Sequence, residues 1–282
     1  TAEEVSLGFD AGGCEAGDLT AEARASGLRQ INMFRWLNGL DPVPYTTDES
    51  VIREVQECAF VLGVNRALTH NPPETFTCYT EGAARAAAQS NIARDDPNYS
   101  VFNFMFDPGA HNYQVGHRRF FISPRLGSVA IGAVPNGDGI GRASCVHVHD
   151  RSGSGTSRPF LAFPNPGVAP IEQLRGLNSD EAPGRWSVSM GERGEDDALS
   201  SGDVVHVYQL PERDEVLIHA EPENDGFFSS GGFAFPGALV WKLDVNPVAG
   251  ESYEVVVERD GDEFLSYEVN LVSCGGRWGN RP

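Results

Sequence analysis

The hydrophobic pattern changes from helical to strand-like near the middle of this 282-residue chain, and this change limits the fold more than any other feature. Between about residues 20 and 125, apolar residues recur at spacings of three and four, which is typical of amphipathic helices. Beyond residue 159, short stretches alternate between apolar and polar residues, as strands do. Residues 150–159 are rich in Ser and Gly and lack apolar side chains, as a linker would. The sequence therefore predicts an α+β chain with two domains.

We expect helices near residues 28–37, 51–62, 82–93 and 99–106, with Thr47 or Asp48 as the cap of the second. Residues 128–134 and 143–149 flank a glycine-rich turn and predict a hairpin. Six later strands are expected at residues 186–190, 204–208, 215–221, 237–243, 252–258 and 264–272. Their regular spacing suggests an immunoglobulin-like β-sandwich. The expected parts are an N-terminal segment (1–19), a helical domain with a small sheet (20–150), a linker (151–158) and a β-sandwich domain (159–282).

Composition and charge exclude several classes of protein. Hydrophobic residues make up 40% of the chain and charged residues 22%, which is ordinary for a globular protein. We find no apolar run near the roughly 18 residues of a transmembrane helix, so no membrane span is expected. The formal net charge of −19 argues against binding to nucleic acid or to anionic membrane surfaces.

The cysteines indicate an oxidising compartment. None of the five forms a C-x-x-C pair, and wide spacing suits one or two disulfides with a thiol left over. A Cys58–Cys78 bridge would tie a loop to the second helix, and Cys14 could pair with Cys274, but the sequence does not choose among the pairings. Residues 1–4 show no signal-peptide features, so we expect a chain cut after a signal peptide, with a lipid anchor upstream of Thr1 also compatible. The protein is therefore expected to be secreted or attached to the cell envelope.

The common catalytic motifs are missing. The sequence contains no G-x-x-x-x-G-K-[ST] loop, no H-E-x-x-H and no G-x-S-x-G, and its clustered glycines do not fit G-x-G-x-x-G. This excludes most familiar nucleotide-dependent enzymes and hydrolases.

Four short segments carry a resemblance instead. They are NRALTHNPP at residues 65–73, SNIA at 90–93, FMFDPG at 104–109 and VGHRRF at 115–120. Together with INMFR at 31–35 and VAIG at 129–132, they resemble the CAP superfamily of sperm-coating, venom-allergen and pathogenesis-related proteins, in its bacterial secreted form. The resemblance covers about residues 20–149.

The resemblance implies an α-β-α sandwich with a cleft that holds two histidines and two acidic residues. The histidines correspond to His70 and His117. Where the family has Glu before Asn, this chain has Ser90 before Asn91. The second acidic position has no secure match, and Asp107 and Glu81 are the candidates to supply a carboxylate.

Two converging imidazoles with one of these carboxylates would suit Zn²⁺, whereas two histidines alone would bind it weakly. A hydrolytic reaction would also need a general base near the metal-bound water. The alternative is that both histidines are structural. We expected Arg118 and Arg119 to form structural ion pairs rather than to bind an anion. His147 and His149 should share one face of a strand, most simply a solvated or polar-packed face.

In the second half, FPNPGVAP at residues 163–170 and RWSVS at 185–189 resemble a β-sandwich that follows some bacterial CAP domains. Trp186 and Trp241 are expected in its core, and residues 225–237, with Phe227 and Phe228, form the candidate binding loop. Three functions stay open: a binding module for a lipid, glycan or protein; a metal-assisted hydrolase acting on cell-envelope polymer or peptide; and a structural adhesin.

Overall fold

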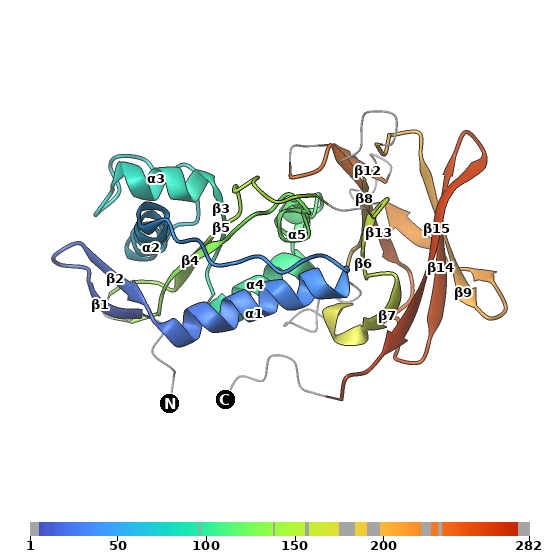
Figure 1. Ribbon diagram of the computed structural model, residues 1–282, viewed down its shortest axis with the longest axis horizontal. Coiled ribbons are helices and arrows are strands. Elements are labelled where there is room, and N and C mark those ends of the chain that lie inside the picture. The colour runs from blue at the N-terminus through green and yellow to red at the C-terminus, as the bar shows by residue number, and fades with distance from the viewer. Residues whose placement is uncertain are drawn as a thin grey trace. The chain divides into compact units, whose positions relative to one another are not determined.

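The structure is a computed structural model that describes residues 6–95, 97–137, 139–155, 158–174, 184–190, 198–220, 227–230 and 233–275. It is a mixed α+β structure, as expected (Figure 1). The chain divides into two compact units. One comprises Thr1–Trp36, Asp41–Val101 and Pro124–Ser154, and the other comprises Leu37–Leu40, Phe102–Ser123 and Gly155–Pro282. Residues 102–123, which we expected in a domain spanning residues 20–150, thus group with the second unit. We describe each unit by itself.

The first unit contains a hairpin, three helices and a three-stranded antiparallel sheet in the order β3-β5-β4. Its elements are β1 (Ser6–Asp10), β2 (Glu15–Leu19), α1 (Ala21–Leu37), α2 (Glu49–Val64), α3 (Glu81–Ala88), β3 (Ser90–Ala93), β4 (Ala130–Val134) and β5 (Ala143–His147). Helix α4 (Pro97–Phe106) begins in this unit. Asp48 caps α2 by accepting hydrogen bonds from Ser50 N and Val51 N, as one of the two expected caps.

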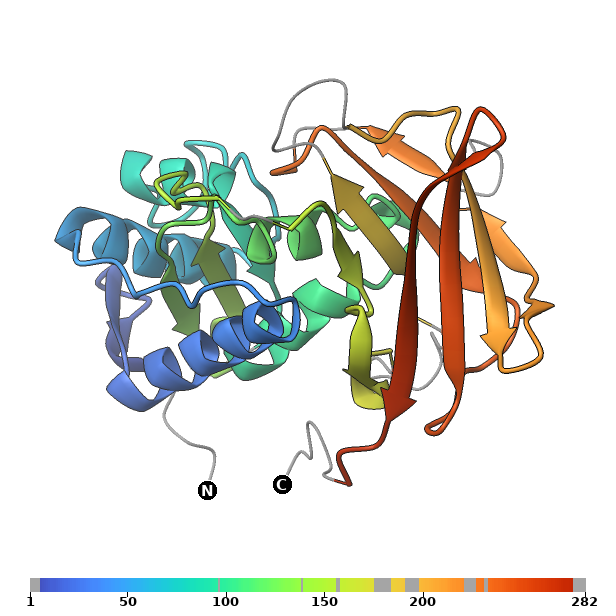
Figure 2. The same cartoon turned by 45° about the vertical axis from the view of Figure 1, so that its right-hand side comes forward.

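Helices α1 and α2 cover opposite faces of this sheet (Figure 2). A Cβ atom added to Gly27 of α1 would lie 2.7 Å from Ile131 of β4, whereas one added to Gly132 would collide with the main chain of Val55 in α2. Ile131 and Gly132 are neighbours on one strand, so they point to opposite faces. The sheet is therefore the middle layer between two helices.

The outer edge of β4 is closed by side chains rather than by another strand. The Tyr45 hydroxyl accepts from Ile131 N and donates to Ile131 O, both at 3.1 Å. The Gln56 side chain of α2 likewise accepts from Ala133 N and donates to Ala133 O, both at 3.1 Å. Burial raises the pKa of the Tyr45 hydroxyl, so it keeps the proton that this arrangement needs. These contacts satisfy main-chain groups that would otherwise be buried without partners.

We predict that Gln56→Ala lowers the free energy of unfolding by about 1–3 kcal/mol, because it leaves the buried N–H and C=O of Ala133 without partners. Urea unfolding followed by circular dichroism measures the change. Gln89→Ala, at an exposed glutamine, is the matched control and should change stability little. Equal effects of the two variants would contradict the role of Gln56.

The disulfide pairings considered from the sequence are wrong. Cys58 of α2 bonds to Cys145 of the central strand β5, and Cys14 bonds to Cys78, while Cys274 is an exposed free thiol. The first bridge forms because Cys58 lies on the face of α2 that packs against the sheet. The second joins the turn of the β1–β2 hairpin to the loop before α3, two segments whose proximity depends on the fold alone. Closing loops of 64 and 87 residues is worth about 4 kcal/mol each in the chain-entropy model.

The second unit contains two sheets, in the orders β10-β9-β14-β15-β7 and β11-β13-β8-β6, with β12 also paired to β13. Strand β7 runs parallel to β15. The strands are β6 (Leu161–Phe163), β7 (Gly167–Pro170), β8 (Trp186–Met190), β9 (Val204–Leu210), β10 (Asp214–Glu215), β11 (Ile218–Ala220), β12 (Phe228–Ser230), β13 (Gly237–Leu243), β14 (Ser252–Arg259) and β15 (Asp262–Val272). The unit also includes α5 (Gly116–Phe121) and short 3-10 helices at Ala110–Asn112 and Ile171–Leu174.

The two sheets lie face to face (Figure 2), and aromatic side chains of both sheets meet between them. Trp186 and Trp241 are fully buried, which confirms both as core residues. The ring of Trp186 meets that of Tyr253, from the other sheet, edge to face at 5.6 Å. This contact makes the unit a β-sandwich.

Two expected elements are corrected. The helix expected at residues 82–93 ends at Ala88, because residues 90–93 instead form β3 and pair with β5. The single strand expected at residues 215–221 is two short strands, β10 and β11, in different sheets, and its last residue lies outside the described part of the chain. Among the described residues, no helix is long and apolar enough to cross a membrane.

Candidate functional site

Asp107 and His117 form a hydrogen-bonded pair in the second unit. The His117 ring Nδ1 lies 2.7 Å from Asp107 Oδ1, and the His117 main-chain N–H donates to Asp107 Oδ2 at 3.1 Å. Asp107 follows α4 and is fully buried, whereas His117 stands in the first turn of α5 with its side chain 23% exposed. The carboxylate therefore fixes both the ring and the start of the helix. The Phe104 ring lies 5.0 Å from that of His117.

The pair raises the basicity of the imidazole. Burial by itself would lower the pKa of His117, but the charge and the hydrogen bond of Asp107 outweigh burial, so the pKa lies above its usual value. The ring therefore keeps its second proton to a higher pH than an exposed histidine does. A protonated imidazole donates hydrogen bonds and cannot ligate a metal.

Arginines hold the segment that carries Asp107. Arg118 donates to the carbonyls of Met105 and Phe106 and to the hydroxyl of Ser187. Arg185 donates to the carbonyls of Asp107 and Gly109. Asp107 adopts a left-handed conformation, φ 55°, which is costly for a non-glycine residue and needs such support.

Arg118 and Arg119, for which we expected structural ion pairs, both donate to main-chain carbonyls. Both are fully buried; the contacts of Arg118 are main-chain carbonyls, a hydroxyl and the Phe163 ring at 3.9 Å, and Arg119 donates to the carbonyl of Phe235. Burial lowers the pKa of Arg118 to about 9, opposed by Asp107 and assisted by Arg185. Burial also lowers the pKa of Arg119 to about 10. Arg118 therefore has a structural role, because it supplies donors inside the core to carbonyls at the end of α4.

The other candidate site residues lie in the first unit. The His70 ring Nδ1 lies 2.8 Å from the Ala87 carbonyl oxygen at the end of α3, so it donates there. Ser90 and Asn91 are buried on β3. The Glu81 side chain is 87% exposed and pairs with Arg85 at 3.9 Å. The structure thus places Asp107 against one histidine of the predicted set, His117, and leaves Glu81 on the surface.

Ser90 lies opposite His147 in the sheet, a pairing that the motif comparison did not suggest. Both are buried, and neither Ser90 Oγ nor His147 Nδ1 has a hydrogen-bond partner among the residues that the structure describes. Burial lowers the pKa of His147, as does His149, while Asp150 and Glu54 oppose the shift. Of the two histidines expected on a solvated or polar-packed face, His149 is exposed and lies just beyond β5, whereas His147 is buried opposite Ser90.

The part of the chain that the structure describes contains no preformed set of metal ligands. There, no group of three or more His, Cys, Asp or Glu side chains is arranged to hold a metal ion. Both oxygens of Asp107 already accept hydrogen bonds from His117. A zinc ion at His117 would thus have to draw its remaining ligands from elsewhere.

No protein-family model matches the chain, and no curated protein matches it significantly.

We predict that Asp107→Asn lowers the pKa of His117 and destabilises the protein, by about 1–3 kcal/mol at pH 5.5. A group whose pKa is raised by folding contributes stability below its unfolded pKa of about 6.5, and this contribution is lost as pH rises through the folded value. The destabilisation should therefore shrink by pH 8.5. Histidine NMR titration and urea unfolding at both pH values test this.

Asp244→Asn is the matched control, because Asp244 pairs with His219 on the surface at 3.1 Å, with both side chains about half exposed. It should change stability little at either pH. If Asp107→Asn costs as much at pH 8.5 as at pH 5.5, the charge interaction with His117 is not its cause.

Proposed function

We propose that this is a secreted or envelope-attached bacterial protein of the CAP type, followed in the chain by an immunoglobulin-like domain, and that it is a ligand-binding module. A sheet covered by helices on both faces is the arrangement that the resemblance implies for the first part. Two disulfides fit an oxidising compartment, and the net charge of −19 disfavours nucleic acid.

The Asp107–His117 pair carries the proposal of binding rather than catalysis. A buried carboxylate orients the imidazole and favours its protonated form, which suits a hydrogen-bond donor to an oxygen of a lipid, glycan or protein ligand. Arg118 and Arg185 fix the loop beneath it, so the donor is preorganised. The serine at position 90, where the family has an acid, removes one carboxylate that a tetrad-based reaction would use.

A metal-assisted hydrolase acting on envelope polymer or peptide is the second candidate. One observation favours it: a carboxylate bonded to one nitrogen of a histidine is also how proteins orient metal-bound imidazoles. His70 and His117 would be the ligands, with Asp107 or Glu81. The exposure of Glu81 and the double engagement of Asp107 count against this set. The adhesin function, which exposed Phe227 and Phe228 would support, gains no such support, because both side chains are half-buried.

The proposal predicts that zinc binds weakly, if at all, and that His117→Ala costs about tenfold or more in affinity for the ligand. Isothermal titration calorimetry with zinc near pH 7 should give the same weak response for the wild type, His70→Ala and His117→Ala. Panels of oligosaccharides, fatty acids and peptides, followed by histidine NMR signals, should perturb His117.

His219→Ala is the control, because this surface histidine also has a carboxylate partner. One zinc ion bound at micromolar affinity or better, and lost in both His70→Ala and His117→Ala, would overturn the binding proposal in favour of the hydrolase. A ligand that binds His117→Ala as tightly as the wild type would remove His117 from the site.

A further inference from the structure

We propose that the Cys14–Cys78 disulfide is a redox modification site, which a dithiol reductant opens in the folded protein while the Cys58–Cys145 bridge stays closed. The two bridges differ sharply in burial. Cys58 and Cys145 are both fully buried within the core between α2 and the sheet. Cys14 is exposed and Cys78 half-buried. Because thiol–disulfide exchange needs a thiolate to reach a sulfur atom, exposure selects the first bridge.

The backbone at this bridge supports the same distinction. Cys14 and Cys78 have φ angles of 58° and 60°, in the left-handed region that side-chain-bearing residues adopt at a cost. Cys58 and Cys145 stand inside a helix and a strand, with regular conformations. Opening the exposed bridge lets two unfavourable conformations relax, whereas opening the buried one leaves two thiols in a packed core.

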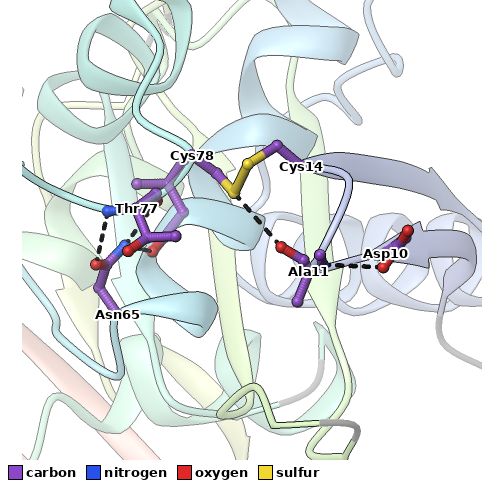
Figure 3. Close-up of a disulfide and its surroundings, with 8 residues drawn as sticks. Asp10, Ala11, Cys14, Asn65, Thr77 and Cys78 are labelled. Atoms are coloured by element: carbon purple, nitrogen blue, oxygen red, sulfur yellow. Dashed lines mark hydrogen bonds between the residues drawn. A yellow bond between two sulfur atoms is a disulfide. The ribbon is translucent and has the colours of Figure 1, made fainter.

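Contacts around the bridge confine the effect of opening it. On one side, the Asn65 side chain donates to the carbonyls of Val61 and Thr77 and accepts from Thr77 N, which keeps the segment before Cys78 in place (Figure 3). On the other side, the hairpin turn is held locally, with Gly12 N donating to Asp10. Beyond the bridge, the Ala16 carbonyl accepts from Gln56. The turn of the hairpin, rather than the core, is what the bridge restrains.

The reaction is a two-electron exchange. A thiolate of the dithiol attacks Sγ of Cys14, the S–S bond breaks, and Cys78 leaves as a thiolate that takes a proton from water. The second thiol of the reductant then attacks the mixed disulfide, releases Cys14 as a thiol and closes its own disulfide. The carbonyl oxygen of Ala11, 3.8 Å from Cys78 Sγ in the oxidised structure, is placed to accept a hydrogen bond from the new thiol (Figure 3).

The test uses the full chain without denaturant. Cys274, the exposed thiol, is first blocked with N-ethylmaleimide and reports complete labelling. Graded dithiothreitol is then added, new thiols are alkylated with iodoacetamide, and peptides are quantified by mass spectrometry. We expect Cys14 and Cys78 to be labelled at least about tenfold faster than Cys58 and Cys145, with the circular dichroism spectrum unchanged. Equal rates for the two bridges, or labelling of Cys14 and Cys78 only after the protein unfolds, would overturn the proposal.

Hydrogen exchange measures whether the bridge restrains the hairpin. Cys14→Ser/Cys78→Ser should raise exchange within residues 6–19 and leave α2 and the three-stranded sheet protected. The reduced wild type should show the same pattern of exchange as this variant. The reduced wild type therefore still tests the proposal if the variant folds poorly. Cys58→Ala/Cys145→Ala is the contrasting variant, and its exchange should rise in α2 and β5. No change in residues 6–19 after reduction would contradict a restraining role.

Discussion

Main-chain polar groups that no helix or strand pairs must find partners inside the protein, and here long polar side chains supply them. Gln56 and Tyr45 do so along the outer edge of β4. Without them, that edge would be a buried row of unsatisfied donors and acceptors, or an open edge exposed to other chains. Helix α2 therefore fixes the sheet in two ways, by packing against its face and by pairing with its edge.

The same constraint shapes the region of the candidate site. At the end of α4 and just beyond it, Arg118 donates to the carbonyls of Met105 and Phe106, and Arg185 donates to those of Asp107 and Gly109. This arrangement brings positive charge into the core and makes a buried aspartate tolerable. Asp107 in turn needs a donor, and His117 supplies two N–H groups. The pair is thus a consequence of how the loop is satisfied, and the raised pKa of His117 follows from the charge and the hydrogen bond of Asp107, which outweigh burial.

Local patterns predicted much of the fold. The strands expected at residues 186–190 and 237–243 match β8 and β13, because short runs rich in β-forming apolar residues mark them in the sequence, and both strands are almost wholly buried. The helix predicted for the alanine-rich residues 82–93 is too long. Helix propensity carries no information about the pairing with β5, which makes residues 90–93 a strand. The resemblance brought out His117 and Asp107 as candidates, but their contact depends on the left-handed turn at Asp107. The buried arginines and the disulfide pairs arise from tertiary proximity, which spacing does not encode.

The two disulfides restrain different parts of the first unit. Cys58 is on α2, two residues after Gln56, so the buried bridge strengthens a contact that the core and the edge of β4 already require. Cys14 and Cys78 instead join a short hairpin to a loop, and the hairpin strands are largely exposed. In a marginally stable protein, a cross-link matters most where few other contacts hold the chain. The exposed bridge is therefore the one whose chemistry can change the local structure while α2 and the sheet remain intact.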